Sequence, residues 1–437
     1  MSIDYTQQPR IATFGAMSYS CPEPKVLPNG TRIYVVDGGA QDINRIEVAY
    51  GGGTFDEPKP MTATLTSSMI VHGSDTYASQ DVAEKLDFYG SWFGSRCTDN
   101  HSIVTLHSLN RCLADTLPML VDIVCRPAFP EKEYELVRGK MRNAYRTARM
   151  KVRYRANVEA SRLFFGTDHP LARDIRDSHI DDVTIDDLRR FHGRYYHPAN
   201  CTLLLSGRIG GRELNMVTEL FGKVPQVREA EPLARPAESR SESRFSIVDC
   251  GNVVQAGISM FMPAIPRSHP DYIKLRVLVM ALGGYFGSRL MSNVREDKGY
   301  TYGITASLLG RISGAHIAIA TECDNSYVGA LIDEVRREME LLRTDLIPDD
   351  ELMMVKSYIM SDLVKMFDTP FSLASYVGST LFFGVSPDYF DRQVEQLRQI
   401  TAADLREMAG KYLNPADATI AVAGDRSKIE PTLNRLF

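Results

Sequence analysis

Residues 183–209 read VTIDDLRRFHGRYYHPANCTLLLSGRI, and residues 400–426 read ITAADLREMAGKYLNPADATIAVAGDR. The two stretches align without a gap at a constant offset of 217 residues, about half of the 437-residue chain. Each predicts the same unit, a helix capped by a threonine, a turn and a buried strand. A repeat this long exceeds the unit of a solenoid, so we expect two copies of one domain that face each other across a shared space. The identical pairs are Thr184/Thr401, Asp187/Asp404, Leu188/Leu405, Arg189/Arg406, Gly193/Gly410, Tyr195/Tyr412, Pro198/Pro415, Ala199/Ala416, Thr202/Thr419 and Gly207/Gly424.

The stretch between the two copies is rich in Pro, Glu, Arg and Ser and has almost no apolar residues suited to a core. Such composition is typical of a linker. We therefore predict an N-terminal domain over residues 1–222, a linker over 223–245 and a C-terminal domain over 246–437. In both halves the predicted strands come as hairpins, with helices grouped between them. This order favours the α+β class, each domain being a mostly antiparallel sheet packed with helices, over a doubly wound parallel sheet.

Composition limits the classes of protein that fit. Hydrophobic residues make up 44% of the chain and charged residues 24%, as in ordinary globular proteins. The net charge of -5 argues against a protein that binds polyanions. We find no signal peptide and no apolar run long enough to span a membrane. Seven scattered cysteines without a CxxC pair indicate reduced thiols, so we expect a cytoplasmic protein.

Several stretches carry a family resemblance, namely LPNGTRIYVV, GGGTFDEP, AFPEKEYELVRGKM, FHGRYYHPANCTLLLSG and especially GYFGSRLMSNVREDKGYTYGI. They resemble the pitrilysin/insulinase/mitochondrial-processing-peptidase family of inverted-motif zinc peptidases, and the resemblance covers nearly the whole chain in order. It implies α/β-roll domains, four of which form a closed chamber around an unfolded peptide. A half-length chain like this one resembles the members that pair with a second subunit, or with themselves, to complete four domains.

The catalytic motif of that family is absent. H-x-x-E-H holds zinc through two His one helical turn apart, and its Glu polarises the zinc-bound water. The resemblance puts these three positions at Thr64, Ser67 and Ser68, the further Glu ligand at Ala144 and its neighbouring Glu at Val137. Hydroxyl and methyl groups are poor substitutes for zinc ligands. We therefore expect no metal in this chain, with zinc held by a partner subunit.

The nine histidines offer no replacement motif, since neither H-x-x-E-H nor H-E-x-x-H occurs. His101 and His107 are six residues apart on a predicted strand and share a face, but no carboxylate or Cys stands beside them. His72 is near the former motif, and a lone His is more often a satisfied surface or core residue.

A second feature of the family is present. Arg295 and Tyr302, in GSRLMSNVREDKGYTYG, match the Arg and Tyr that the resemblance assigns to the C-terminal half. There they reach across the chamber, hydrogen-bond the peptide carbonyl and stabilise the negative charge that develops on it. A guanidinium and a phenol are donors suited to an oxyanion. The alternative is that Arg295 pairs with Glu296 or Asp297 and that Tyr302 packs in the core.

The substrate-binding strand edge of the family is altered. Its Asn-Ala falls at Gly94-Ser95, so the edge can remain as an added-strand site while its substrate-binding side chain is lost. Trp92, the only tryptophan, lies in the same stretch, and we expect it in the core.

Residues 136–158 carry eight Lys and Arg residues and no acid, and five of the arginines fall near a single helical stripe: Arg138, Arg142, Arg146, Arg149 and Arg153. The basic stretch 138–155 is interpreted as a solvated helix face. A chamber wall that attracts acidic peptide is the first alternative. A nucleic-acid surface is the second, and it lacks interleaved aromatic platforms beyond two tyrosines.

Two hypotheses for function remain. The first is the non-metal subunit of a heterodimeric processing peptidase, which gives Arg295, Tyr302 and half of the chamber to a partner with H-x-x-E-H. The second is a non-catalytic structural or peptide-binding homologue, like the family members that became core subunits of a respiratory complex. A self-sufficient zinc peptidase is a distant third.

Overall fold

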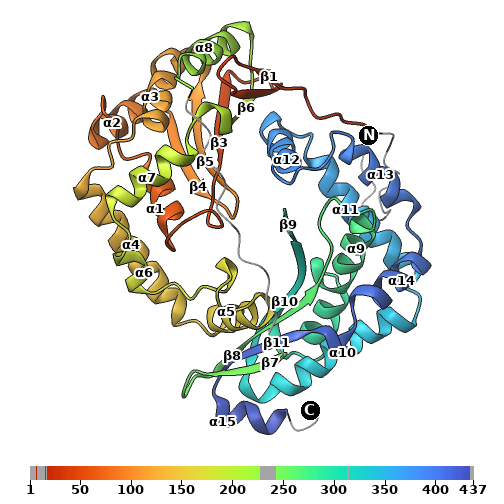
Figure 1. The fold of residues 1–437 in the computed structure, drawn as a ribbon. Coiled ribbons are helices and arrows are strands. Elements are labelled where there is room, and N and C mark those ends of the chain that lie inside the picture. Colours follow the sequence, from red (N-terminus) through yellow and green to blue (C-terminus); the bar gives the residue numbers. More distant parts are fainter. Residues whose placement is uncertain (1–5, 7–14, 16, 227–242, 313, 434–437) are drawn as a thin grey trace.

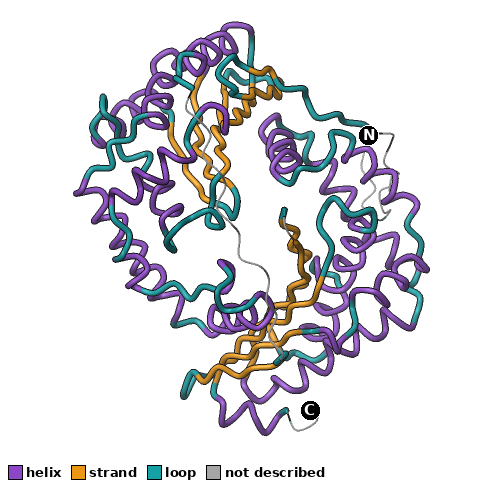
Figure 2. Tube along the Cα trace, viewed as in Figure 1, coloured by secondary structure: helices purple, strands orange, loops and turns teal. Residues whose placement is uncertain are grey.

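The computed structural model describes residues 6, 15, 17–226, 243–312 and 314–433. Figure 1 shows two halves that curve toward each other around a central space. In Figure 2 most helices lie on the outside of each half and the strands lie toward the inside. The α+β class expected from the order of the elements is confirmed.

The first half builds a six-stranded sheet in the order β1-β2-β6-β3-β5-β4. Its strands are β1 (Lys25–Val26), β2 (Arg32–Asp37), β3 (Ile43–Gly51), β4 (Trp92–Cys97), β5 (His101–Leu109) and β6 (Cys201–Gly207). Its helices are α1 (Thr62–Met69), α2 (Ser79–Tyr89), α3 (Leu113–Cys125), α4 (Glu131–Arg149), α5 (Val152–Phe165), α6 (Asp177–Asp181), α7 (Ile185–Tyr195) and α8 (Gly211–Gly222).

The second half builds a five-stranded sheet in the order β7-β11-β8-β10-β9. Its strands are β7 (Phe245–Asp249), β8 (Gln255–Pro263), β9 (Thr301–Arg311), β10 (Gly314–Asp324) and β11 (Thr419–Gly424). Its helices are α9 (Tyr272–Val279), the π-helical segments η4 (Met280–Gly284) and η5 (Met291–Asp297), α10 (Val328–Thr344), α11 (Asp349–Lys365), α12 (Pro370–Phe382), α13 (Tyr389–Gln399), α14 (Ala402–Tyr412) and α15 (Arg426–Ile429).

The repeated unit occupies the same place in both sheets. β6 pairs in parallel with β2 and antiparallel with β3, and β11 does the same with β7 and β8. The predicted capping boxes are present: Asp187 N donates to Thr184 Oγ1 at 3.2 Å, and Asp404 N donates to Thr401 Oγ1 at 3.2 Å. In each half the last strand thus lies between two earlier strands of its sheet, β6 between β2 and β3 and β11 between β7 and β8.

One helix of each half packs on the sheet of the other half. From α5, Phe164 and Phe165 enter an apolar cluster with Phe261 of β8 and Ala421 of β11. From α12, Val377 packs with residues of β2 and β6. α12 ends 217 residues after α5 (382 against 165), which is the offset of the repeat. The exchange is therefore reciprocal, and each sheet needs the other half to cover one of its faces.

The predicted linker is only partly visible. α8 ends at Gly222 and β7 begins at Phe245. Most of the predicted linker, residues 227–242, lies outside the described residues. The domain boundaries at 222 and 246 remain predictions.

Candidate functional site

Helix α1 is fixed at its N-terminus by a buried carboxylate. Glu57 accepts hydrogen bonds from Met61 N at 3.1 Å and Ala63 N at 3.0 Å, and it pairs with Arg173 at 2.6 Å. Its side chain is 3% exposed, and this burial raises the pKa of Glu57 to about 7, although the Ala63 N–H and Arg173 oppose the rise. A carboxylate at a helix start satisfies free N–H groups and complements the helix dipole.

The positions aligned with the zinc motif lie on α1 and α4. Thr64 and Ser68 are half-buried and one helical turn apart, so they share a face of α1. Ser67 is 1% exposed, and its hydroxyl has no hydrogen-bond partner among the described residues. Val137 is buried in the apolar cluster that joins α4 to α1, and Ala144 is exposed on α4.

This set of side chains does not fit zinc. Structural and catalytic zinc sites use thiolate, imidazole and carboxylate ligands, none of which these five positions supply. One of the five, Val137 of α4, is instead part of a helix contact, where it packs with Leu65 and Met69 of α1. Within the described ranges, no group of three or more His, Cys, Asp or Glu side chains is placed to hold a metal ion.

His72 follows Ser68 by one turn and has a carboxylate partner from α4. Its Nδ1 lies 3.8 Å from Glu133 Oε2, and both side chains are partly exposed. Burial lowers the pKa of His72, as does Lys140, while Glu133 opposes the change. The pair gives two possible metal ligands and no third.

Arg295 and Tyr302 come from adjoining segments of the second half. Arg295 lies on η5 with its guanidinium over the ring of Phe286, at 4.6 Å from the ring centre. Tyr302 is the second residue of β9 and is 93% exposed. The alternative placement is wrong, because Tyr302 is outside the core and Arg295 forms no ion pair with a described residue. Whether the two serve a catalytic site is a separate question.

Gly94 and Ser95 lie on β4, the last strand of the first sheet. They pair with Thr105 and Val104 of β5, so the other edge of β4 has no strand beside it in the described part of the chain. A Cβ at Gly94 would meet only the ring of Trp92, at 3.5 Å, so the structure does not require glycine there. An unpaired edge is suited to an added peptide strand.

Trp92 is not in the core as expected. It is 54% exposed and stacks on His107, with ring centres 3.6 Å apart. His101 packs instead on Phe382 of α12, at 4.5 Å. The two histidines therefore serve separate aromatic contacts.

A cavity that the sequence did not indicate lies between the halves. It has a volume of about 460 Å³ and is lined from the first half by Arg45, Glu47 and Arg96 and from the second half by Arg311 and Phe382. Arg311 of β9 pairs with Asp99 in the β4–β5 turn, which ties the two sheets together at this cavity. No local sequence pattern predicts this cavity, because the residues of its two walls are about 200 or more positions apart in the sequence.

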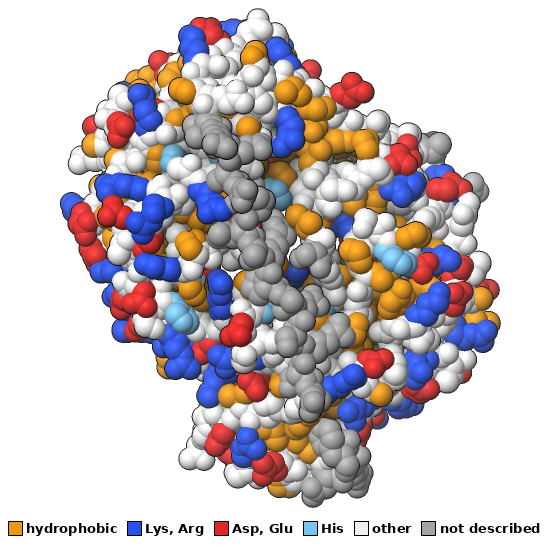
Figure 3. Space-filling view, in the orientation of Figure 1, with side chains coloured by type: hydrophobic (Ala, Val, Ile, Leu, Met, Phe, Trp, Pro, Cys, Tyr) orange, Lys and Arg blue, Asp and Glu red, His pale blue; other side chains and the backbone are white. Residues whose placement is uncertain are grey.

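The basic stretch is neutralised in part, since four of its eight cations pair with described acids, namely Arg138, Arg142, Arg146 and Arg149. Arg142 pairs with Asp181 and Arg146 with Asp177, both on α6, and Arg138 pairs with Glu135 at 2.7 Å on its own helix. In Figure 3 blue and red side chains alternate along the flank where Figure 1 shows α4 and α6. This face is a network of surface ion pairs, which argues against the chamber-wall and nucleic-acid alternatives.

No helix in the described part of the chain is long and apolar enough to cross a membrane.

Comparison with known proteins shows which families and structures the chain is similar to. The family described as "Peptidase M16 inactive domain" matches residues 182–358. An uncharacterised zinc protease of Streptomyces coelicolor is 22% identical over 84% of this chain and 81% of its own length. A non-peptidase homologue of Helicobacter pylori is 19% identical over 86% of this chain and 88% of its own.

Solved structures agree on the fold. A Pseudomonas fluorescens peptidase M16 inactive domain superposes with a TM-score of 0.84 at 20% identity, covering 92% of this chain and 98% of that one. A chain of Candida albicans complex III2 superposes with a TM-score of 0.74 at 14% identity, covering 95% and 97%. The family match and these relatives confirm that the chain is similar to the M16 (pitrilysin/insulinase) peptidase family, as its sequence motifs indicated.

Proposed function

We propose that this chain is the non-zinc subunit of an M16 processing peptidase. It contributes half of a peptide chamber, together with Arg295 and Tyr302, to the zinc site of a homologous subunit that carries H-x-x-E-H. The substrate is an unfolded peptide, and the compartment is the cytoplasm. Zinc belongs to the partner, because Thr64, Ser68 and Ala144 offer no suitable ligands.

The proposal rests on the exposure and the contacts of the two donors, Tyr302 and Arg295. Tyr302 is 93% exposed and lies at an irregularity near the start of β9, between Thr301 and Ile304, which pair with β10 while Tyr302 does not. Arg295 is half-buried over Phe286 and has no acidic partner among the described residues. Donors without an internal partner among the described residues are suited to an external carbonyl oxygen, which becomes negative in the transition state of peptide hydrolysis.

The first half is better suited to binding a peptide than to hydrolysing it. The free edge of β4 can hold a peptide as an added strand through its backbone alone, whatever side chain stands at position 94. A self-sufficient zinc peptidase is disfavoured by the buried, ligand-poor contact between α1 and α4.

The second candidate is a structural or peptide-binding homologue. This candidate is supported by the likeness to a chain of Candida albicans complex III2 and to a non-peptidase homologue of Helicobacter pylori. The loss of side chains at Gly94 and Ala144 is consistent with such a role.

The test is reconstitution with a homologous H-x-x-E-H subunit from the same source. We expect neither this chain nor the partner to cleave an unfolded peptide efficiently alone, and the mixture to do so. Arg295→Ala and Tyr302→Phe are then each expected to lower kcat about 100-fold, with little change in peptide affinity, because these donors act mainly on the transition state.

Arg406→Ala is the matched control, since Arg406 is exposed on α14, on the outside of the second half in Figure 1. Gel filtration confirms that each variant still assembles, and it also shows whether the isolated chain forms a homodimer. If the assembled Arg295→Ala/Tyr302→Phe double variant works at the wild-type rate, the structural candidate replaces this one.

A further inference from the structure

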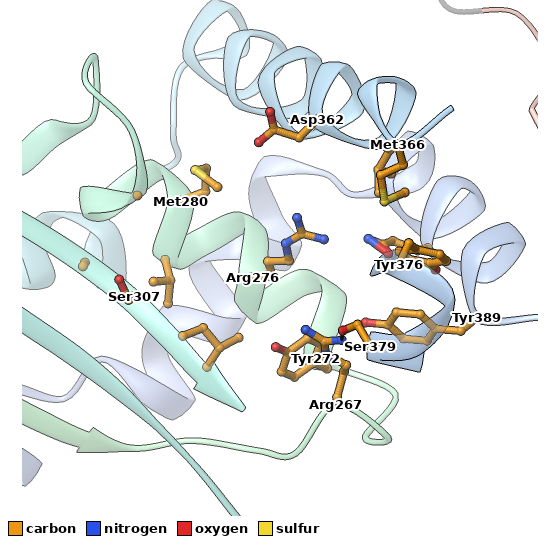
Figure 4. Close-up of a pocket in the computed structure, with 16 residues that line it drawn as sticks. Arg267, Tyr272, Arg276, Met280, Ser307, Asp362, Met366, Tyr376, Ser379 and Tyr389 are labelled. Atoms are coloured by element: carbon orange, nitrogen blue, oxygen red, sulfur yellow. Dashed lines mark hydrogen bonds between the residues drawn. The ribbon is translucent and has the colours of Figure 1, made fainter. Parts of the chain in front are cut away.

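A second cavity, of about 430 Å³, lies within the second half. It is enclosed by α9, α11, α12, α13 and β9, and Figure 4 shows its lining. Arg276 extends from α9 and lies between Asp362, Tyr376 and Ser379 in that view. None of these residues belongs to the Arg295–Tyr302 pair or to the α1–α4 contact. The cavity is therefore a separate candidate site.

The charge of the cavity wall is positive on balance. Arg276 forms no hydrogen bond or ion pair with a described side chain. Arg267 donates to Ser379 Oγ at 2.7 Å and stacks on Phe383, while its Nε is buried without a partner. Asp362, on the opposite wall, pairs with Lys365 at 3.2 Å. Two guanidinium groups face one carboxylate that already has a cationic partner, so the wall is suited to an anionic ligand.

Neutral donors without partners line the same space. Gln393 is 2% exposed, and its Nε2 has no hydrogen-bond partner in the described structure. The Tyr376 hydroxyl is likewise buried and unpartnered. Burial raises the pKa of Tyr376, as it does for Tyr389, so both hydroxyls keep their protons at neutral pH. Buried polar groups rarely stay unpaired, because each such group costs free energy.

Apart from Ser307 of β9, most of the remaining lining is apolar and comes from α9, η4, β9 and the C-terminal end of α11. A compact ion would leave this surface without contact, whereas an acid with an apolar body covers it. The apolar residues are Val279, Met280, Leu308, Leu363 and Met366.

We propose that this cavity binds the carboxylate of an organic acid with an apolar body, with Arg276 as its main charge partner and Arg267, Tyr376 and Gln393 as further donors. The carboxylate can belong to a small free acid or to the C-terminal residue of a peptide. This site does not depend on the proposed function, because the chain alone provides every group that contacts the ligand.

The test is calorimetric titration of the full chain with four probes. These are N-acetyl-leucine, its amide, and the peptide acetyl-Ala-Ala-Leu with a free or an amidated C-terminus. We expect saturable binding of at least one acid and at least about tenfold weaker binding of the matching amide, because the amide loses the charge-assisted bonds. Binding of the peptide acid alone identifies a peptide terminus as the source, and binding of both acids identifies the carboxylate with its side chain as sufficient.

Variants locate the site. Arg276→Gln is expected to weaken binding of the acid at least about tenfold, and Tyr376→Phe, which keeps the ring and its packing, a few-fold. Arg406→Gln is the control and leaves binding unchanged. Thermal unfolding verifies that each variant is folded. Equal binding of acid and amide, no saturable binding of either acid, or unchanged binding in both Arg276→Gln and Tyr376→Phe would overturn the proposal.

Discussion

The helix pair α1–α4 in the first half and the pair α9–α11 in the second occupy corresponding places. α1 and α9 each follow the strand that pairs antiparallel with the repeated strand, and α4 and α11 each precede the exchanged helix. The first pair is closed by apolar contacts among Leu65, Met69 and Val137. The second leaves a cavity with Arg276 and Asp362 on its walls. Equivalent positions in one fold thus differ in chemistry through side chains alone.

The largest effect is expected when zinc ligands are introduced into the helix pair α1–α4. The variant Thr64→His/Ser68→His/Ala144→Glu changes only half-buried or exposed positions and leaves the buried Ser67 in place. We expect it to hold one zinc per chain after dialysis and to unfold at a higher temperature with zinc, because metal binding to the folded state stabilises it.

Wild-type protein is expected to hold no stoichiometric zinc in the same elemental analysis. The double variant Thr64→His/Ser68→His, which lacks the third ligand, serves as control and binds more weakly. One chelatable zinc in the wild-type chain would show that the loss of the site was misread. No zinc in the triple variant would show that α4 does not bring position 144 to α1.

The next effect compares the two exchanged helices. Phe164→Ala in α5 removes a buried ring from an aromatic cluster and should destabilise the protein by about 3–5 kcal/mol. Val377→Ala in α12 removes two methyl groups and should cost about 2 kcal/mol. Chemical denaturation measures both. A larger loss in Val377→Ala would reverse our ranking of the two contacts.

The capping boxes allow a finer comparison of the two copies. Asp187 is 4% exposed and pairs with Lys59 at 2.8 Å and Arg190 at 2.5 Å, whereas Asp404 is 25% exposed and pairs with Lys274 at 2.6 Å. Asp187→Ala should cost about 2 kcal/mol, because it removes a buried carboxylate that accepts hydrogen bonds from Thr184 and Lys59. Asp404→Ala should cost about 1 kcal/mol, as for a typical cap. Equal losses would show that burial does not separate the two copies.

Their pH dependence has a defined sign. Burial opposes ionisation of Asp187, but hydrogen bonds from Lys59 and Thr184 outweigh it and lower its pKa below the ordinary value. Hydrogen bonds from Lys274 and Thr401 lower the pKa of Asp404 from 3.8 to about 2. A lowered folded-state pKa gives stability that is present above the unfolded pKa and lost as pH falls. The gap between wild type and either variant should therefore shrink below pH 4, as measured by urea denaturation.

The smallest effect belongs to the basic stretch. Arg146 and Asp177 are 56% and 31% exposed, and surface pairs of this kind contribute less than about 1 kcal/mol. Arg146→Ala should therefore change the unfolding midpoint little. Arg153→Ala, at an exposed position without an ion pair in the described residues, is the control. A loss well above that of the control would mean that the network with α6 acts cooperatively.

The sequence alone determined the repeat, the capping boxes and the α+β class, because these depend on local patterns such as the spacing between Thr184 and Asp187. It also predicted that the positions matching the zinc motif carry no ligands, since a residue such as Ala144 has no donor atom whatever the fold around it. The sequence did not determine whether the side chains of Arg295 and Tyr302 have internal partners, because exposure depends on neighbours distant in the chain.

Only the tertiary structure decided how the halves join. Nothing local in Phe164 says that it packs on the sheet of the other half, because apolar periodicity shows that a face is buried and not against what. The exposure of Trp92 followed from its place on an edge strand, where a stacked ring on His107 covers one face only. The cavity around Arg276 arose in the same way, since α9, α11 and α13 meet there from segments about 100 residues apart. Local rules fix the elements, and long-range packing fixes which surfaces they leave for ligands and partners.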